Sequence, residues 1–376
     1  MTTYQLYATM GVGFESVVAK ELKRLGYQTK TENGRVFFSG TDLDIAKTNI
    51  SLRSADRIKI LLKEFKSLDF DTLYNETFAL DWAQLLPVDA RFPVKGQSVR
   101  SKLHSEPGIQ SIVKKAIVDK LCKQYHRRGF LPETGRLFPL DIRLDKDQAR
   151  VSLDTTGSSL FKRGYRIEHG GAPLKENFAA GLLELTPYNG THPIIDPMTG
   201  SGTIAIEAAL IARHIAPGMN RQFAFDSFDW MNPKWHQMAL EEAKSEVKSG
   251  DEHAPIWASD LDQSILAVAK VNANNAGVLQ DISFKQLAVK DFATDLENGI
   301  IIANPPYGKR LRDEESAEQL YRQMGTVFRP MTSFSQYYLT ADLEFEKFFG
   351  KRATKKRKLY NGNLRTDFYQ YWANRH

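Results

Sequence analysis

The chain has 376 residues, which is too long for one ordinary hydrophobic core and suits two or three domains. Hydrophobic residues make up 42% and charged residues 26%, a composition that excludes disordered and collagen-like proteins. Cys122 is the only cysteine, so an intramolecular disulfide and a cysteine-rich zinc site are excluded as well. The first residues do not read as a signal peptide, and no apolar stretch is long enough to span a bilayer. We therefore expect a cytoplasmic protein.

The positive charge of the chain is clustered. The net charge is only +6, but residues 91–130 hold ten Lys and Arg against two acids, and six of the eight residues 351–358 are basic. Clusters of this kind indicate a nucleic-acid partner, although a solvated face can have the same composition.

The chain divides by pattern into regions 1–44, 45–155, a linker 156–171 and 172–376. The first region predicts a strand at 4–8, a helix at 14–25 and a strand at 35–39. The second predicts a hairpin near 140–153 and an amphipathic helix whose buried stripe is Ile109, Ile112, Val113, Ala116, Ile117 and Leu121. The basic side chains at or beyond the edge of that stripe are candidate RNA contacts: Lys114, Lys115, Lys123, Arg127 and Arg128.

The linker interleaves aromatic and basic residues in Phe161-Lys-Arg-Gly-Tyr-Arg166. Such a segment can stack on RNA bases and contact phosphates, which makes Lys162, Arg163 and Arg166 candidate RNA contacts. It can equally pack two domains together, and the sequence favours neither interpretation.

The last region alternates strands and helices. This rhythm is typical of an α/β, Rossmann-like fold with a mostly parallel sheet covered by helices on both faces. The Asn361-Gly362 pair predicts a final antiparallel hairpin. The predicted strands are 193–196, 256–259, 282–288, 299–303 and 337–340, and the main helices are 203–214 and 263–276.

The segment Asp196-Pro-Met-Thr-Gly-Ser-Gly-Thr203 lies where a strand passes into a helix. Its glycines let the backbone approach a ligand, and the helix N-terminus offers unpaired N–H groups. Gly200-x-Gly202-x-x-Ala205 also fits the dinucleotide fingerprint, but Gln222 stands where that fingerprint requires an acid. A nicotinamide oxidoreductase is therefore disfavoured and stays an alternative.

Two acidic positions follow the next strands. Asp260 ends the second strand, where its carboxylate could accept both ribose hydroxyls of a nucleoside. Asp262 is expected to cap the following helix. Asp291-Phe292 follows the third strand, where the acid could accept from an adenine amino group and the ring could stack on it.

Asn304-Pro-Pro-Tyr-Gly308 follows a strand that reads as buried on both faces. Pro305 and Pro306 give up two N–H donors and stiffen the turn, which aims carbonyl groups outward. The Asn304 side-chain oxygen and the Pro305 carbonyl could each accept a hydrogen from one exocyclic amino group, while Tyr307 stacks on the base. An ordinary strand-end turn is the alternative.

These motifs resemble those of class I S-adenosylmethionine-dependent methyltransferases that modify exocyclic amines. Together with Phe161-Lys-Arg-Gly-Tyr-Arg166 and Ala172-Pro-Leu-Lys-Glu176, the chain resembles the THUMP-domain RNA methyltransferases similar to RlmL, which make N2-methylguanine in large-subunit ribosomal RNA. The resemblance covers essentially the whole chain. It implies a ferredoxin-like and THUMP RNA-binding region before a seven-stranded methyltransferase domain.

The resemblance also assigns roles to residues. Asn304, Pro305, Pro306 and Tyr307 would hold the target amino group, without a metal. S-adenosylmethionine would be bound by Asp196, Met198, Thr199, Gly200, Ser201, Gly202, Thr203, Asp260, Leu261, Asp291, Phe292 and Asn304.

The expected partner is RNA, most simply 23S ribosomal RNA or an assembling large ribosomal subunit, with no membrane. The larger family members carry a second methyltransferase module, which this sequence lacks, so a single modified position is expected. The alternatives are methylation of tRNA guanine-N2 or of adenine-N6 in RNA or DNA, and a binding protein without activity.

Overall fold

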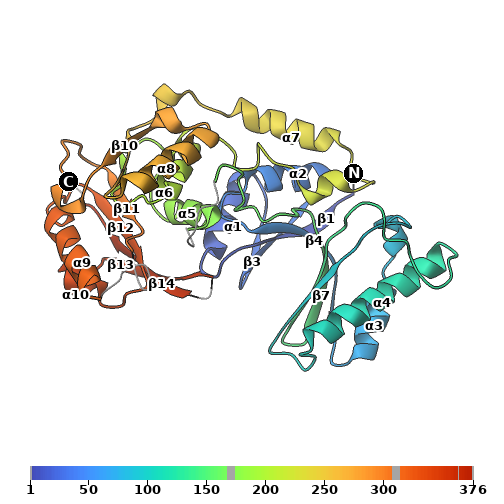
Figure 1. Ribbon diagram of the computed structural model, residues 1–376. Helices are drawn as coiled ribbons and strands as arrows, with labels where there is room; N and C mark the ends of the chain where they lie inside the picture. The colour runs from blue at the N-terminus through green and yellow to red at the C-terminus, as the bar shows by residue number, and fades with distance from the viewer. Residues whose placement is uncertain (1, 167–173, 307–313, 363, 375–376) are drawn as a thin grey trace.

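Two seven-stranded sheets, each covered by helices, form the molecule (Figure 1). The computed structural model describes residues 2–166, 174–306, 314–362 and 364–374. Within these residues no helix is both long and apolar enough to cross a membrane.

The first sheet has the strand order β2-β3-β1-β4-β7-β6-β5 and is antiparallel except for the parallel pair β5–β6. Its strands are β1 (Tyr4–Thr9), β2 (Lys30–Glu32), β3 (Arg35–Gly40), β4 (Arg57–Lys66), β5 (Val94–Val99), β6 (Leu140–Asp145) and β7 (Gln148–Asp154). Strand β4 pairs with β1 on one side and β7 on the other, and its register shifts between Leu61 and Lys63. The two N-terminal regions therefore share one sheet through β4.

The helices of this part are α1 (Glu15–Arg24), α2 (Asp42–Ser51), α3 (Phe70–Phe78) and α4 (Glu106–Gln124), with a 3-10 turn η1 at Trp82–Gln84. The predicted stripe of α4 is confirmed, since all its members are buried except Ile112, which is half-buried. The predicted hairpin is β6–β7, and its turn residues Lys146 and Asp147 have φ of 53° and 65°. Figure 1 shows α3 and α4 at the end of the molecule far from the second sheet.

The second sheet has the order β10-β9-β8-β11-β12-β14-β13, in which β14 alone runs opposite to the other strands and pairs antiparallel with β12 and β13. Its strands are β8 (Ile194–Asp196), β9 (Ile256–Asp260), β10 (Ile282–Gln286), β11 (Ile300–Ala303), β12 (Ser335–Thr340), β13 (Lys355–Asn361) and β14 (Leu364–Tyr371). The predicted parallel sheet and the hairpin at Asn361-Gly362 are thus confirmed.

Six helices belong to the second part within the described residues: α5 (Glu176–Glu184), α6 (Thr203–Ala212), α7 (Lys234–Ser245), α8 (Gln263–Asn275), α9 (Glu314–Phe328) and α10 (Phe345–Phe349). Its 3-10 turns are η2 (Ala224–Ser227), η3 (Gly250–Glu252), η4 (Leu279–Asp281) and η5 (Val289–Asp291). All four residues of β11 are buried, as expected for a central strand covered on both faces. One apolar core is continuous from Leu6 of the first sheet to Leu339 of the second, so the two parts pack as neighbours.

Candidate active site

The glycine loop between β8 and α6 has the open geometry that the sequence predicted. Gly200 and Gly202 have φ of 53° and 85°, a region that side chains other than glycine seldom adopt. A Cβ atom on Gly200 would point into open space, whereas one on Gly202 would lie 3.0 Å from the Cβ atom of Ala269. Gly202 therefore permits α6 to pack on α8, and Gly200 leaves a free backbone surface above the loop.

Asp260 is held against this loop at the end of β9. Its Oδ2 accepts a hydrogen bond from the Gly200 amide at 2.9 Å, and its Oδ1 accepts from the Asp262 amide at 3.1 Å. Asp262 itself accepts from the amides of Ser264 and Ile265 at the start of α8, which confirms its predicted role as a helix cap. Leu261, between the two acids, is 70% exposed.

Several polar atoms are buried at this edge of the sheet. Asn304 Oδ1 has no hydrogen-bond partner among the described residues, and the Asp196 carboxyl faces only Thr199 Oγ1 and the Met198 amide, without a well-formed hydrogen bond. Burial, together with the nearby Asp260 charge, raises the pKa of Asp196 to about 7. Buried polar groups are seldom left unpaired in native proteins, so these atoms fit a site that is completed by a polar ligand.

Asn304 lies at the same edge because β11 is parallel to β8, with Ile300 opposite Ile194 and Ile301 opposite Ile195. Pro305 is buried, and Asn304 and Pro306 are half-buried. Tyr307 lies outside the described residues.

The third acidic position follows β10. Asp291 is exposed at the end of η5, and Phe292 is half-buried with its ring 5.6 Å from that of Phe328. Their assignment to the adenine stays a prediction.

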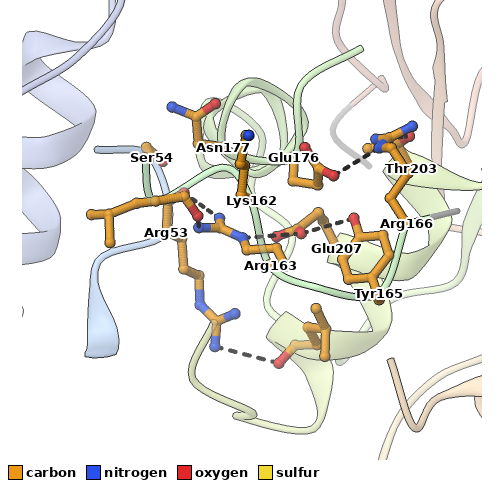
Figure 2. Close-up of polar contacts among 12 residues, drawn as sticks. Arg53, Ser54, Lys162, Arg163, Tyr165, Arg166, Glu176, Asn177, Thr203 and Glu207 are labelled. Atoms are coloured by element: carbon orange, nitrogen blue, oxygen red, sulfur yellow. Dashed lines mark hydrogen bonds and ion pairs between the residues drawn. The ribbon is translucent and has the colours of Figure 1, made fainter. Parts of the chain in front are cut away.

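Arg166 binds the glycine loop from the linker (Figure 2). Its guanidinium donates to Ser201 Oγ at 3.2 Å, to Thr203 Oγ1 at 3.0 Å and to Glu176 Oε1 at 2.7 Å. The prediction that Arg166 contacts RNA is therefore wrong for this structure, because all these donors are used inside the protein. Nothing in the sequence indicates Glu176 as the partner of Arg166.

The predicted RNA contact of Arg163 is also wrong for this structure. Its side chain is buried and donates to Glu207 and to the carbonyl oxygens of Arg53 and Leu160, which leaves it no surface for RNA. Lys162, by contrast, is exposed. Of the two interpretations of the linker, domain packing is the one that describes Arg163 and Arg166.

The predicted basic surface on α4 is partly engaged within the protein. Lys114 Nζ lies 3.5 Å from the centre of the Phe92 ring and 2.7 Å from Glu133, and Lys115 pairs with Asp119 at 2.6 Å. The side chains beyond them, Lys123, Arg127 and Arg128, are exposed. Phe130, which follows this basic pair and was not singled out from the sequence, is 76% exposed.

No group of three or more His, Cys, Asp and Glu side chains within the described ranges is arranged to hold a metal ion.

Three family models match the chain in succession. They are the RlmL ferredoxin-like domain at residues 5–59, the THUMP domain at 68–154 and the RMKL-like methyltransferase domain at 163–370. The last of these covers more than half of the chain. The chain belongs to the RMKL-like methyltransferase family. The resemblance that the sequence motifs indicated is thus confirmed.

Relatives of this RMKL-like methyltransferase extend over its whole length. It is 48% identical over 375 residues to a Bacillus subtilis protein named "Putative RNA methyltransferase YpsC", covering 99% of this chain and 97% of that protein. It is 32% identical to the "Ribosomal RNA large subunit methyltransferase K/L" of Shewanella amazonensis, covering 98% of this chain. The chain spans 53% of the latter protein, or about half of its length.

Solved structures give the same picture of the fold. SMU.472, described as "a putative methyltransferase complexed with SAH" (S-adenosylhomocysteine), is 47% identical, with a TM-score of 0.94 over 100% of both chains. A Listeria monocytogenes protein described as a "predicted N6-adenine-specific DNA methylase" is 48% identical, with a TM-score of 0.94 over 100% of this chain and 97% of that one. TrmN of Thermus thermophilus shares the fold. It is 20% identical, with a TM-score of 0.68 over 98% of this chain and 99% of that one.

Proposed function

We propose that this RMKL-like methyltransferase transfers a methyl group from S-adenosylmethionine to the exocyclic N2 amino group of a guanine in RNA, with 23S ribosomal RNA as the substrate. The observation that carries the proposal is the buried Oδ1 of Asn304 at the carboxyl end of β11, which has no hydrogen-bond partner among the residues that the structure describes. It is an acceptor in the place where an amino group must be held.

The edge of the sheet fits the cofactor. When bound, S-adenosylmethionine supplies an electrophilic methyl group on its sulfonium. Each carboxylate oxygen of Asp260 has a lone pair left after binding the Gly200 and Asp262 amides, and can accept from a ribose hydroxyl. Further contacts are proposed for Asp196, Met198, Thr199, Gly200, Ser201, Gly202, Thr203, Leu261, Asp291, Phe292 and Asn304. The complex of SMU.472 with S-adenosylhomocysteine supports this reading.

Asn304 and Pro305 act on the target nitrogen. Two acceptors, Asn304 Oδ1 and the Pro305 carbonyl, each take a hydrogen bond from the amino group and draw its lone pair out of conjugation with the base. Pro306 stiffens the turn, and we place Tyr307 against the base ring. Positioning and electrostatics are the main sources of catalysis in such a site. The base must leave any stacked helix to reach it.

We assign RNA binding to residues 45–155, held by residues 1–44 and the linker 156–171 relative to the catalytic residues 172–376. The THUMP match, the exposed side chains of Lys123, Arg127 and Arg128 and the exposed ring of Phe130 support this assignment. Lys162 is exposed on the linker, and we propose it as a further RNA contact. The names of the Bacillus subtilis and Shewanella amazonensis relatives favour RNA, and the latter favours the large ribosomal subunit.

The test is transfer of labelled methyl from S-adenosylmethionine to ribosomal RNA isolated from cells that lack the gene, followed by digestion to nucleosides. We expect label in N2-methylguanosine of large-subunit RNA, and labelling about 100–1,000-fold slower with the Asn304→Ala variant. Label in tRNA would show that the substrate is not ribosomal RNA, and label in N6-methyladenosine would show that the methylated base is adenine. Absence of label from every RNA, with S-adenosylhomocysteine still bound, would contradict the proposal.

A further inference from the structure

A second cleft, of about 680 Å³, lies between the first sheet, the start of α5 and the turn of the last hairpin. Its walls come from three distant parts of the chain: the loop at residues 10–14 with Asp56, the segment Lys175 to Phe178, and Tyr360 to Gly362. Sites for small ligands are typically about 300–1,000 Å³ in volume. No described residue of the glycine loop or of the β11 end lines this cleft, so it is distinct from the candidate active site.

Hydrogen-bond acceptors form one wall of the cleft. Asn177 is 5% exposed, and its Nδ2 donates to Asp56 Oδ1 at 2.8 Å and to the Ala55 carbonyl at 3.3 Å. These bonds fix the amide so that its Oδ1 is buried, and that oxygen has no partner among the described residues. The cleft is therefore lined by the Asp56 carboxylate and by Asn177, whose buried amide oxygen has no donor among the described residues.

The other walls are aromatic and basic. Phe14 and Phe178 form an edge-to-face pair with ring centres 4.9 Å apart, and Tyr360 is half-buried at the hairpin turn. Lys358 Nζ lies 5.3 Å from the centre of the Tyr360 ring, and Lys175 lines the cleft directly. Aromatic surface beside positive charge is the combination by which proteins hold an unpaired nucleotide.

The acceptor wall selects among the bases. Guanine alone presents two adjacent N–H donor groups, N1–H and the N2 amino group, on its Watson–Crick edge. Adenine and cytosine place an acceptor nitrogen next to their amino group, and uracil has one N–H between two carbonyl groups. The acceptor atoms of adenine, cytosine or uracil would lie against the acceptor oxygens of Asp56 and Asn177 and would be repelled by them.

We propose that this cleft binds one unpaired guanine nucleotide of the RNA substrate, other than the nucleotide that is methylated. Its base edge bonds to Asp56 and Asn177, its ring lies against Tyr360 and its phosphate lies near Lys175. The inference rests on the proposed function for the identity of the polymer.

The cleft is also linked to the glycine loop through the start of α5. Figure 2 shows the neighbouring side chains Glu176 and Asn177 pointing to opposite sides of the start of α5, with Glu176 directed to Arg166. Arg166 in turn bonds to Ser201 and Thr203. A nucleotide in the cleft would thus order the same helix start that supports the glycine loop.

The test is photolabelling of the full chain with 8-azidoguanosine monophosphate while S-adenosylhomocysteine saturates the cofactor site. We expect label on the tryptic peptide 359–365, which contains Tyr360, and competition by GMP about tenfold more effective than by AMP. Asp56→Asn should reduce that preference to below about threefold, while Asp251→Asn, at an exposed acid that does not line the cleft, should leave it unchanged.

Tyr360→Leu is the second variant, because Asp56 also supports Asn177 and its loss could disturb folding. This variant should lose the label while its melting temperature and its affinity for S-adenosylhomocysteine stay those of the wild type. Label only on the peptide containing Asn304, or equal competition by AMP and GMP, would overturn the inference. If the protein transfers methyl groups but GMP and AMP compete equally, only the cleft inference is wrong. If GMP is preferred but no methyl transfer occurs, only the proposed function is wrong.

Discussion

Arg163 and Glu207 form an ion pair that is buried where the linker crosses helix α6, with Nε and Oε1 3.4 Å apart and side-chain exposures of 3% and 0%. Tyr165 also donates to Glu207 Oε1 at 3.1 Å, and Arg163 donates to the Arg53 carbonyl (Figure 2). Arg53 follows α2 in the first part of the molecule. The pair therefore joins three segments and fixes the first part of the molecule, at Arg53, relative to helix α6 of the second part.

Replacing Glu207 with alanine should lower the free energy of unfolding by about 3–5 kcal/mol, since Arg163 would be left charged and buried without its partner. Urea denaturation at pH 7 measures this loss. The matched control is Glu344→Ala, which removes an exposed pair with Lys347 and should cost less than about 0.5 kcal/mol. Equal losses in the two variants would contradict the structural role given to the buried pair.

The contrast between the linker and the catalytic strand ends shows what a sequence can predict. Periodicity fixes α4 and the parallel sheet because apolar side chains repeat at the spacing of the element they bury. Asp260 and Asn304 could be placed because strand ends meet at one edge of a parallel sheet. Arg163 could not be placed, since its partner Glu207 lies 44 residues further along the chain and only the tertiary fold brings them together. The cleft at Asn177 was missed for the same reason.

Asn304→Ala should reduce the rate of methyl transfer by a factor of about 100–1,000, the usual cost of removing one group aimed at developing charge. Because Asn304 acts on the target amine, the affinity for S-adenosylhomocysteine should stay nearly unchanged. Asn304→Asp keeps an acceptor oxygen and should retain more activity than the alanine variant. Single-turnover kinetics measures the rate of methyl transfer, and calorimetry measures the affinity for S-adenosylhomocysteine. A wild-type rate in Asn304→Ala would exclude the role.

Asp260→Ala should weaken binding of S-adenosylhomocysteine about 10–100-fold, as expected when hydrogen bonds to a charged group are lost. The neighbouring acid is the control. Asp262 caps α8 through the Ser264 and Ile265 amides, so Asp262→Ala should lower the melting temperature and leave the dissociation constant unchanged. Calorimetric titration of both variants with S-adenosylhomocysteine measures the two dissociation constants. If Asp262→Ala weakened binding as much as Asp260→Ala, the assignment of the ribose to Asp260 would fail.

Asp196 should make stability fall as pH rises. Burial raises the pKa of its carboxyl in the folded chain from 3.8 to about 7. Below about pH 4 the group is protonated in both states, and between pH 4 and 7 only the unfolded state releases the proton, so unfolding becomes easier. One pKa unit corresponds to about 1.4 kcal/mol.

The Asp196→Asn variant has no such proton to lose. Its free energy of unfolding relative to the wild type should therefore increase between pH 5 and pH 8, as measured by urea denaturation of the cofactor-free protein. A difference that stays constant across this range would show that the carboxyl titrates normally.

Binding of RNA should depend steeply on salt, and the dependence should come from the exposed basic residues that follow α4. Each lost phosphate contact lowers the slope of log affinity against log salt by about 1, so the double variant Arg127→Gln, Arg128→Gln should lower it by about 2. Phe130→Ala should weaken binding through lost stacking and leave the slope unchanged. Lys244→Gln, at an exposed position on α7, is the charge control and should change neither quantity. Filter binding of large-subunit RNA at several salt concentrations measures all four proteins, and an equal slope in the wild type and the double variant would place the RNA elsewhere on the surface.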